Sequence, residues 1–173
     1  MRDELWIFGY GSLVWRPDFP FVERCAACVR GWSRRFWQAS TDHRGVPRAP
    51  GRVVTLAAEP ETVCWGVVYR VAGSLRETVL ARLDARESGG FTRRNVEATL
   101  RRSRDERVLA LTYIAPPGNP NFLGPAPNGE IARQVRASHG PSGSNLEYVL
   151  RLADSLRELG VDDDPVLELA ALL

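Results

Sequence analysis

The sequence predicts an α+β fold with a mixed or antiparallel sheet that can close into a small barrel. Six or seven segments have strand-like composition, helical patterns gather late in the chain, and no β-α-β alternation repeats. With 173 residues, 44% hydrophobic and 25% charged, the chain has the composition of one ordinary globular domain, spanning residues 1–173.

The first predicted strand, Glu4–Phe8, ends in the stretch Gly9-Tyr10-Gly11-Ser12-Leu13-Val14-Trp15. Its glycines permit backbone angles that other residues avoid, so the loop can turn successive N–H groups toward a carboxylate or an oxyanion. A tight turn between two strands is the structural alternative. The motif alone leaves both interpretations open.

Two further strands are predicted over Val22–Gly31 and Arg34–Ala39, with a turn or bulge at Gly31-Trp32-Ser33. Aromatic and arginine residues cluster in this region, namely Arg30, Trp32, Arg34, Arg35, Phe36 and Trp37. Such a cluster can bind nucleic acid by stacking and phosphate contacts. The net charge of only +2 favours instead a strand with an aromatic core face and an arginine face, so we expect no nucleic-acid partner.

The cysteine pair Cys25-Ala26-Ala27-Cys28 has the spacing of a redox pair or of half a zinc site. The pair lies in an apolar, strand-like segment, whereas a redox pair usually opens a helix. A zinc ion would also need Cys64 and either His43 or His139 to converge on the pair. We therefore expect small buried thiols and no metal.

A long loop is predicted over Ser40–Gly51, which is rich in glycine and proline. His43 in this loop is either a general base or a hydrogen-bond donor that braces the loop, and we favour the second role. Strands follow over Arg52–Ala58 and Thr62–Ala72, and a tight hairpin is expected at Glu59-Pro60-Glu61.

A helix is predicted to begin at the capping box Ser74-Leu75-Arg76-Glu77 and to run to about Ala85. Its apolar face consists of Leu75, Val79, Leu80 and Leu83. Glu87 then lies just beyond the helix, before Gly89-Gly90. The negative end of a helix raises the pKa of a nearby carboxyl, which suits a group that must exchange protons; a solvated loop glutamate is the alternative.

The rest of the chain supplies two strands, a proline-rich loop and three helices. The strands are Phe91–Arg102 and Arg107–Ala115, the loop is Pro116–Gly129, and the helices are Glu130–Ser138, Ser144 to Gly160 and a short docked helix within Val161–Leu173. The second helix opens with another capping box, Ser144 to Glu147. Its expected buried face consists of Leu146, Val149, Leu150, Ala153 and Leu156.

Composition excludes several classes of function. All 23 basic residues are arginine, so lysine Schiff-base chemistry is excluded and every cationic contact must come from arginine or backbone amides. No segment approaches the roughly 18 apolar residues of a membrane span, and no secretory signal core is visible at the N-terminus. We expect a cytoplasmic protein without a membrane partner and make no prediction of oligomeric state.

Several motifs, taken together with Gly9–Trp15, carry a family resemblance. They are Arg34–Gln38, Ser40–Pro47, Pro50–Leu56, Trp65–Arg70, Leu83–Phe91, Asn119–Ala126 and Gly140–Tyr148. In this order they resemble the ChaC-type γ-glutamylcyclotransferases, from about Trp6 to about Gly160. The resemblance implies a small β-barrel packed with helices.

The resemblance also implies a reaction, in which the α-amine of glutathione attacks the γ-carbonyl to release 5-oxoproline and Cys-Gly. Glu87 matches the family's catalytic glutamate, and Gly9–Val14 and Tyr148 match its substrate-binding residues. Neither a metal nor an organic cofactor is implied. Phe91 stands where many relatives have tyrosine. A group of four arginines, Arg34, Arg35, Arg44 and Arg52, supplies candidates for the glycine-end carboxylate.

Two other functions remain compatible with the same residues. One is a cyclotransferase for other γ-glutamyl amino acids or amines, against which the Trp65–Arg70 and Ser142–Tyr148 matches weigh. The other is a non-catalytic module that binds a γ-glutamyl ligand in the same loop.

Overall fold

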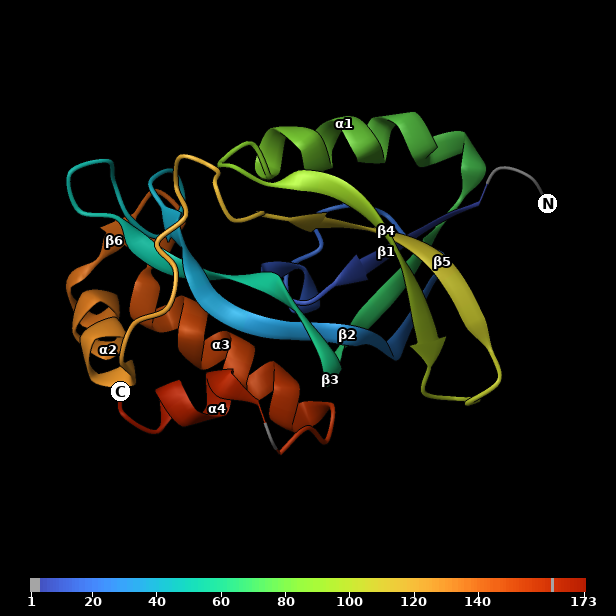
Figure 1. Ribbon diagram of the computed structural model, residues 1–173. Coiled ribbons are helices and arrows are strands. Elements are labelled where there is room, and N and C mark those ends of the chain that lie inside the picture. The colour runs from blue at the N-terminus through green and yellow to red at the C-terminus, as the bar shows by residue number, and fades with distance from the viewer. Residues whose placement is uncertain (1–3, 163) are drawn as a thin grey trace.

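A computed structural model describes residues 4–162 and 164–173, and its centre is a closed five-stranded barrel (Figure 1). The strands are β1 Leu5–Gly9, β2 Glu23–Ser40, β3 Gly51–Val71, β4 Thr92–Leu100 and β5 Arg107–Ile114, in the spatial order β1-β3-β2-β4-β5. β1 and β5 pair in parallel, and the other neighbours are antiparallel. The predicted mixed barrel is therefore confirmed.

Helices cover the barrel on two sides (Figure 1). α1, Arg76–Arg86, lies on one side, while α2, Asn128–Ala137, α3, Asn145–Glu158, and α4, Pro165–Ala170, lie on the other. Short 3₁₀ turns, η1 (Ser12–Val14) and η2 (Gly73–Leu75), follow β1 and precede α1, and a two-stranded ribbon of β6 (His139–Gly140) and β7 (Gly143–Ser144) precedes α3. No helix in the described ranges is both long and apolar enough to cross a lipid bilayer.

β2 and β3 are each one long strand where the sequence predicts two. Ala58 pairs with Trp32 and Val63 pairs with Arg30, so both halves of β3 follow the same partner strand and the predicted hairpin is wrong. Residues 59–62 bulge out opposite Gly31, whose φ of 80° favours glycine. A bulge tolerates Pro60 because it leaves ladder hydrogen bonds unmade.

Arg34 is buried, contrary to the expected separation of arginines from the core. Its side chain shares the inward face of β2 with Phe36 and forms an ion pair with Asp164, just before α4. Arg34 Nε donates to the Tyr10 carbonyl at 2.7 Å and Nη2 donates to the Trp65 carbonyl. The arginine thus connects the residue that follows β1, strand β3 and the N-cap residue of α4.

The first predicted capping box is wrong. The residue before α1 is Leu75, which makes no side-chain cap, because the 3₁₀ turn η2 leads directly into the helix. At α3 the Ser144 hydroxyl does accept from the Glu147 N–H at 3.0 Å, as predicted. The Glu147 carboxylate, however, binds Arg44 and Arg151.

The buried face of α3 is rotated relative to the prediction. It consists of Asn145, Tyr148, Val149, Leu152, Ala153 and Leu156. Leu150 is 39% exposed and the prediction of its burial is wrong, because Tyr148 and Leu152 define the centre of the inward stripe.

The three cysteines are free thiols, with Cys28 and Cys64 buried and Cys25 partly buried. Cys25 and Cys28 are three residues apart on β2, so their side chains leave opposite faces of the strand. Their spacing therefore gives no shared site on this strand.

Candidate active site

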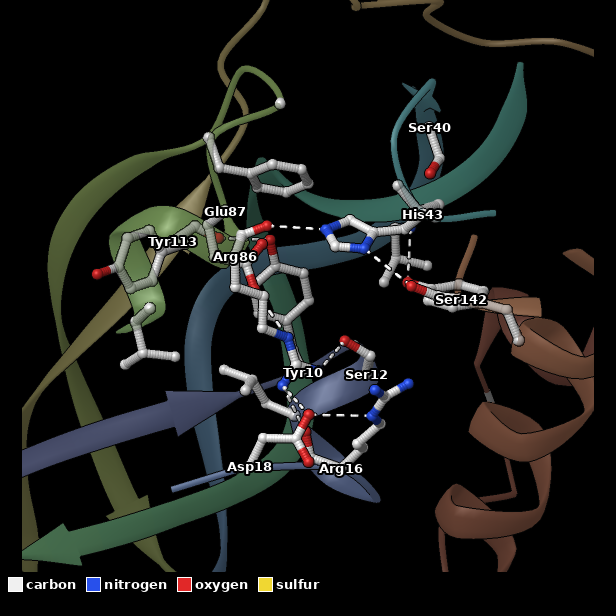
Figure 2. Close-up of a pocket in the computed structure, with 18 of the residues that line it drawn as sticks. Tyr10, Ser12, Arg16, Asp18, Ser40, His43, Arg86, Glu87, Tyr113 and Ser142 are labelled. Atoms are coloured by element: carbon white, nitrogen blue, oxygen red, sulfur yellow. Dashed lines mark hydrogen bonds and ion pairs between the residues drawn. The ribbon is translucent and has the colours of Figure 1, made fainter. Parts of the chain in front are cut away.

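A cavity of about 350 Å³ opens at the end of the barrel where β1 passes into η1 (Figure 2). Segments far apart in sequence line it, including Tyr10–Leu13, Ser40 to Arg44, Arg82 to Gly89, Ser142 and Tyr148. Figure 2 shows His43 and Ser142 on one side of this space and Arg86 and Glu87 on the other. The volume lies in the range of small-molecule sites, about 300–1,000 Å³.

Gly9, the last residue of β1, and Gly11 both lie in closely packed surroundings. A Cβ on Gly9 would lie 2.7 Å from Leu13 Cβ. A Cβ on Gly11 would lie 3.1 Å from Val54 Cγ2 and 3.2 Å from the Tyr148 hydroxyl. Neither glycine has a positive φ, so space and not a left-handed backbone is what this loop needs.

The same loop presents backbone donors. The N–H groups of Val14, Trp15 and Arg16 are used within the turn, on the carbonyls of Gly11 and Ser12. Among residues 4–162 and 164–173, no protein acceptor receives the N–H groups of Gly11, Ser12 or Leu13. The residues that carry these three consecutive donors all line the cavity.

Glu87 lies immediately after the last residue of α1, as the sequence predicts, and its N–H donates to the Leu83 carbonyl at 2.9 Å. Burial raises the pKa of the Glu87 carboxyl, the charges of Arg86 and His43 oppose that rise, and Asp42 adds to it. The Glu87 side chain is 17% exposed, and its Oε1 lies 3.8 Å from Arg86 Nε. Burial is thus the main cause of the raised pKa of Glu87. The sequence alone predicts the negative end of α1 as the cause.

The turn after Glu87 is held by a pair of side-chain amides. Gln38 and Asn119 exchange two hydrogen bonds of 2.9 Å, and Gln38 Nε2 also donates to the Gly89 carbonyl at 2.9 Å. Gly90 has a φ of 103°, and a Cβ there would lie 2.4 Å from Asn119 Oδ1. The long loop after β5 therefore supports the backbone that carries Glu87.

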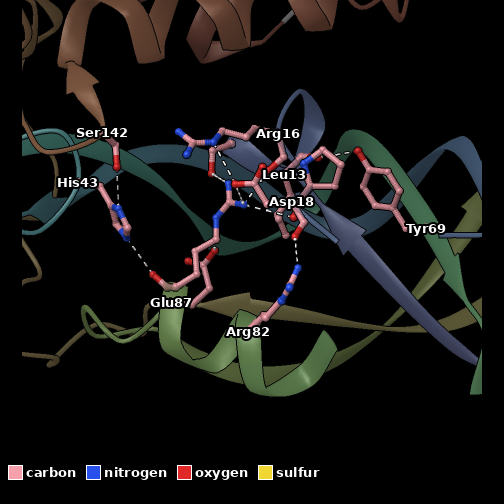
Figure 3. A network of polar contacts seen from close by, with 11 residues as sticks. Leu13, Arg16, Asp18, His43, Tyr69, Arg82, Glu87 and Ser142 are labelled. Atoms are coloured by element: carbon pink, nitrogen blue, oxygen red, sulfur yellow. Dashed lines mark hydrogen bonds and ion pairs between the residues drawn. The ribbon is translucent and has the colours of Figure 1, made fainter. Parts of the chain in front are cut away.

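Polar side chains near the end of α1, at Glu87, and in the loop after η1, at Arg16 and Asp18, belong to one network of contacts (Figure 3). Within this network Arg86 connects α1 to the loop. Its Nη2 donates to Ser12 Oγ at 2.7 Å and its Nη1 donates to the Arg16 carbonyl at 2.7 Å. The Asp18 carboxylate lies 3.4 Å from Nη1. Sequence reasoning missed Arg86, although its place beside Glu87 in the last helical turn was a visible signal.

His43 braces the other side of the cavity, as predicted. Its Nε2 lies 3.0 Å from the Arg86 carbonyl and its Nδ1 lies 3.0 Å from Ser142 Oγ. Because a carbonyl only accepts, Nε2 carries a proton and donates it to the Arg86 carbonyl, while Nδ1 contacts the Ser142 hydroxyl. His43 thereby connects the backbone beside Glu87 to the loop before α3.

Two tyrosines form part of the cavity wall. The Tyr148 hydroxyl accepts from the Val54 N–H at 3.1 Å, and the Tyr10 hydroxyl donates to the Tyr113 carbonyl at 2.6 Å. Burial raises the pKa of both phenols, so both are neutral near pH 7. Phe91 also lines the cavity, where it offers an apolar ring and no hydroxyl.

Comparison with known proteins gives a consistent result. The family profile described as ChaC-like protein matches residues 5–173. A human glutathione-specific γ-glutamylcyclotransferase 1 is 50% identical, over 90% of this chain and 71% of the relative. A glutathione-specific γ-glutamylcyclotransferase from Saccharomyces cerevisiae is 32% identical, over 91% of this chain and 87% of its own length.

Solved structures agree with this match. The crystal structure of a yeast γ-glutamyl cyclotransferase specific to glutathione superposes with a TM-score of 0.92 at 31% identity, covering 98% of this chain and 95% of its own. A more distant γ-glutamyl cyclotransferase, with a TM-score of 0.59 at 17% identity, shares the fold. The barrel, the cavity at its end and the near-complete sequence match together show that this chain belongs to the ChaC-like protein family.

Proposed function

We propose that this protein is a γ-glutamylcyclotransferase that cleaves glutathione into 5-oxoproline and Cys-Gly. Two relatives, which are 50% and 32% identical to this chain, are named as glutathione-specific γ-glutamylcyclotransferases. One observation of this structure carries the proposal: a buried carboxyl with a raised pKa, Glu87, shares a cavity with three unused backbone donors. The reaction needs two catalytic contributions from the protein, which are proton transfer and stabilisation of an oxyanion.

The reaction needs no enzyme nucleophile and consumes no water. Glu87 takes a proton from the α-ammonium group, and the freed nitrogen attacks the γ-carbonyl carbon to close a five-membered ring. The carbonyl oxygen becomes an oxyanion, which the N–H groups of Gly11, Ser12 and Leu13 stabilise. When the intermediate collapses, the C–N bond to cysteine breaks and the departing nitrogen receives the proton from Glu87. The ring nitrogen then gives its extra proton to the regenerated Glu87 carboxylate, which passes it to the released amine and leaves a neutral lactam.

The environment of Glu87 suits both proton transfers. A raised pKa makes the carboxylate a stronger base, and it keeps the protonated form accessible as the acid for the leaving nitrogen. His43 and Arg86 oppose the rise, so the carboxylate form remains available. Shuttling by one such group is worth about 10²–10⁴ in rate.

The substrate-binding residues in this proposal are Gly9, Tyr10, Gly11, Ser12, Leu13, Val14 and Tyr148, and together they hold the γ-glutamyl moiety. Two observations support this assignment. A side chain on Gly9 or Gly11 would press on Leu13, Val54 or Tyr148 and displace the loop, and the Tyr148 hydroxyl lies close to Gly11 while it braces the Val54 N–H.

We extend the proposal to the organisation of the whole chain. Residues 1–173 act as one catalytic domain, which is supported by a family match over residues 5–173. A cytoplasmic location is supported by the three free thiols, since disulfides are rare in that compartment.

The direct test is release of 5-oxoproline from glutathione by the purified protein, with Glu87→Gln as the paired variant. Glutamine keeps the size of the side chain but cannot exchange a proton. We expect the kcat of the variant to fall at least about 10²-fold while KM changes little. A variant that keeps more than about a tenth of wild-type turnover would exclude Glu87 as the proton shuttle.

A substrate panel separates the competing functions in the same assay. Binding of glutathione without 5-oxoproline release would indicate a non-catalytic module, and equal rates on γ-glutamylamines would indicate a broader cyclotransferase. Equal rates on γ-glutamyl-cysteine and α-glutamyl-cysteine would contradict intramolecular cyclisation, because the α-peptide cannot close the same ring.

Metal removal is the second test of the chemistry. The proposed steps use only Glu87 and backbone N–H groups, so dialysis against a chelator should leave the rate of 5-oxoproline release unchanged. Loss of activity on chelation, followed by recovery with added zinc, would contradict the proposed mechanism.

A further inference from the structure

We infer that Arg44 is the residue that binds a carboxylate group of the substrate, an inference that rests on the proposed function. Of the four arginines that the sequence offered for this role, Arg44 is the one that lines the cavity formed by the described residues. Its side chain is 5% exposed, yet part of its guanidinium is unpaired by protein.

The other three sequence candidates are occupied elsewhere. Arg34 donates from all three nitrogens, to Tyr10, Asp164 and Trp65. Arg52 donates Nε to Gln134 and Nη1 to the carbonyls of Phe36 and Gly124. Arg35 pairs with Glu59, at the bulged part of β3.

The other arginines that line the cavity make their contacts with the loop after η1. Arg86 donates to Ser12 and to the backbone of residues 16 and 17. Arg16 pairs with Asp18 at 3.0 Å with its side chain 50% exposed, and Arg82, which is exposed, donates to the Asp18 carbonyl. Because exposed pairs are screened by water, these two arginines offer weaker recognition than a buried guanidinium.

Arg44 is fixed in position before any ligand arrives. Its backbone N–H donates to Ser40 Oγ at 2.9 Å, and its Nη1 donates to the Ser144 carbonyl and to Glu147 Oε2, both at 3.1 Å. The guanidinium also lies over the Tyr148 ring, 5.7 Å from its centroid. A side chain held in this way loses little entropy when it binds a ligand.

The unused edge of this guanidinium faces an accessible space. Across residues 4–162 and 164–173, no acceptor receives a hydrogen bond from Arg44 Nε or Nη2. Within the same ranges Arg35 Nε is the one fully enclosed side-chain nitrogen or oxygen without a partner, so these two Arg44 nitrogens are not fully enclosed. Arg44 itself lines the cavity.

The Nε and Nη2 donors of an arginine form a planar fork that matches the two oxygens of a carboxylate. The chain contains no lysine, so no ammonium group competes for this role. Glutathione brings two carboxylates, one on the γ-glutamyl α-carbon and one on glycine. The Nε and Nη2 donors of Arg44 can bind either carboxylate, and the experiment below distinguishes the two.

The test compares wild type, Arg44→Gln and Arg151→Gln on glutathione and on its C-terminal glycinamide. Arg151 is a matched control because it contacts the same Glu147 carboxylate, at 3.0 Å, but does not line the cavity. We expect Arg44→Gln to lose about 10–100-fold in kcat/KM on glutathione, the size expected for a lost charge-assisted contact. Arg151→Gln should stay within about threefold of wild type.

The two substrates identify the carboxylate. If Arg44 binds the glycine carboxylate, wild type will lose a similar factor on the glycinamide and Arg44→Gln will no longer distinguish the two substrates. If it binds the γ-glutamyl carboxylate, Arg44→Gln will lose the same factor on both. Wild-type kinetics of Arg44→Gln on both substrates, or an equal loss in Arg151→Gln, would overturn the assignment.

Two further measurements keep the outcome decisive. Arg44→Lys keeps the charge near Glu147 but lacks the fork, so it should fold and still lose at least about tenfold on glutathione. Unchanged kinetics in this variant would also overturn the inference. If wild type releases no 5-oxoproline, the proposed function fails separately, and calorimetric Kd values for glutathione in wild type and Arg44→Gln then decide the role of Arg44.

Discussion

Glu87 is placed where an ionised carboxylate is costly, and this has a consequence for stability. Burial raises its pKa in the folded protein above the value of about 4.3 expected in an unfolded chain. In the pH range between these two values the folded state binds more protons than the unfolded state. The contribution of Glu87 to the free energy of unfolding therefore falls as pH rises through that range.

The first prediction at the residue scale is that Glu87→Gln melts at a higher temperature than wild type near neutral pH. The neutral amide removes the buried charge, so the difference in Tm should be largest above the raised pKa. It should diminish as the pH falls to about 4 and below, where the wild-type carboxyl becomes protonated in both states. Thermal melts across pH 4–8 measure it, and a gain that does not depend on pH would contradict the role of the charge.

Some residue positions could be predicted from local signals in the sequence, and others could not. The position of Glu87 beyond its helix follows from the apolar period of α1 and from Gly89-Gly90, and both are local signals. The roles of Arg34 and Gln38 are not predictable in this way. Their partners Asp164 and Asn119 lie far along the chain, and only the closed barrel brings them together.

At the scale of elements, the turn after α1 depends on the size of one glycine. Gly90 has a φ of 103°, and a Cβ at this position would lie 2.4 Å from Asn119 Oδ1 and 2.7 Å from Gln38 Nε2. Gly118 is a natural control, because it has a φ of 91° but a Cβ there would meet nothing within 4 Å. Comparing substitutions at Gly90 and Gly118 therefore separates the effect of backbone conformation from the effect of a steric clash.

We predict that Gly90→Ala and Gly118→Ala both lose stability, by about 1–3 kcal/mol for the backbone strain alone. Gly90→Ala should lose more, since it also displaces the Gln38–Asn119 pair. Its kcat should fall by at least about tenfold, because a small displacement of a proton-transfer group is costly, whereas Gly118→Ala should keep wild-type kcat. Equal kcat values for the two variants, measured by 5-oxoproline release, would contradict a role of this turn in positioning Glu87.

Elements were predicted well where local periodicity decides and poorly where pairing decides. The strands β4 and β5 lie close to their predicted ranges. The interruption at Glu59-Pro60-Glu61 has the composition of a hairpin, but β2 continues beside it with a bulge at Gly31. The residue pattern of one strand does not specify how the neighbouring strand pairs with it. Here that pairing register produces a bulge where the local composition predicts a turn.

On the scale of the whole molecule, one buried ion pair joins the C-terminal helix to the barrel and the barrel to the active-site loop. Asp164 Oδ1 accepts from the Val166 N–H at 2.9 Å and caps α4, while Oδ2 pairs with Arg34. Arg34 in turn holds the Tyr10 carbonyl at 2.7 Å, next to the backbone donors of Gly11–Leu13. Arg34 and Asp164 therefore form a continuous chain of contacts from α4 to the loop.

We predict that Asp164→Ala lowers the free energy of unfolding by about 3–5 kcal/mol, because it leaves the Arg34 charge buried without its partner. Asp154→Ala is the matched control, since Asp154 pairs with Arg157 on the surface, where the two side chains are 70% and 54% exposed. That control should cost no more than about 1 kcal/mol.

The same variant tests the coupling between α4 and the loop. Urea unfolding measures the stability of Asp164→Ala, and steady-state kinetics at a temperature where it remains folded should show a raised KM for glutathione, since an unpaired Arg34 no longer fixes the Tyr10 carbonyl. Asp164→Asn keeps an oxygen for the helix cap and removes only the charge, so it should share the kinetic defect with a smaller loss of stability. Wild-type KM in both variants, together with a stability loss in Asp164→Ala, would show that the ion pair supports the fold without shaping the site.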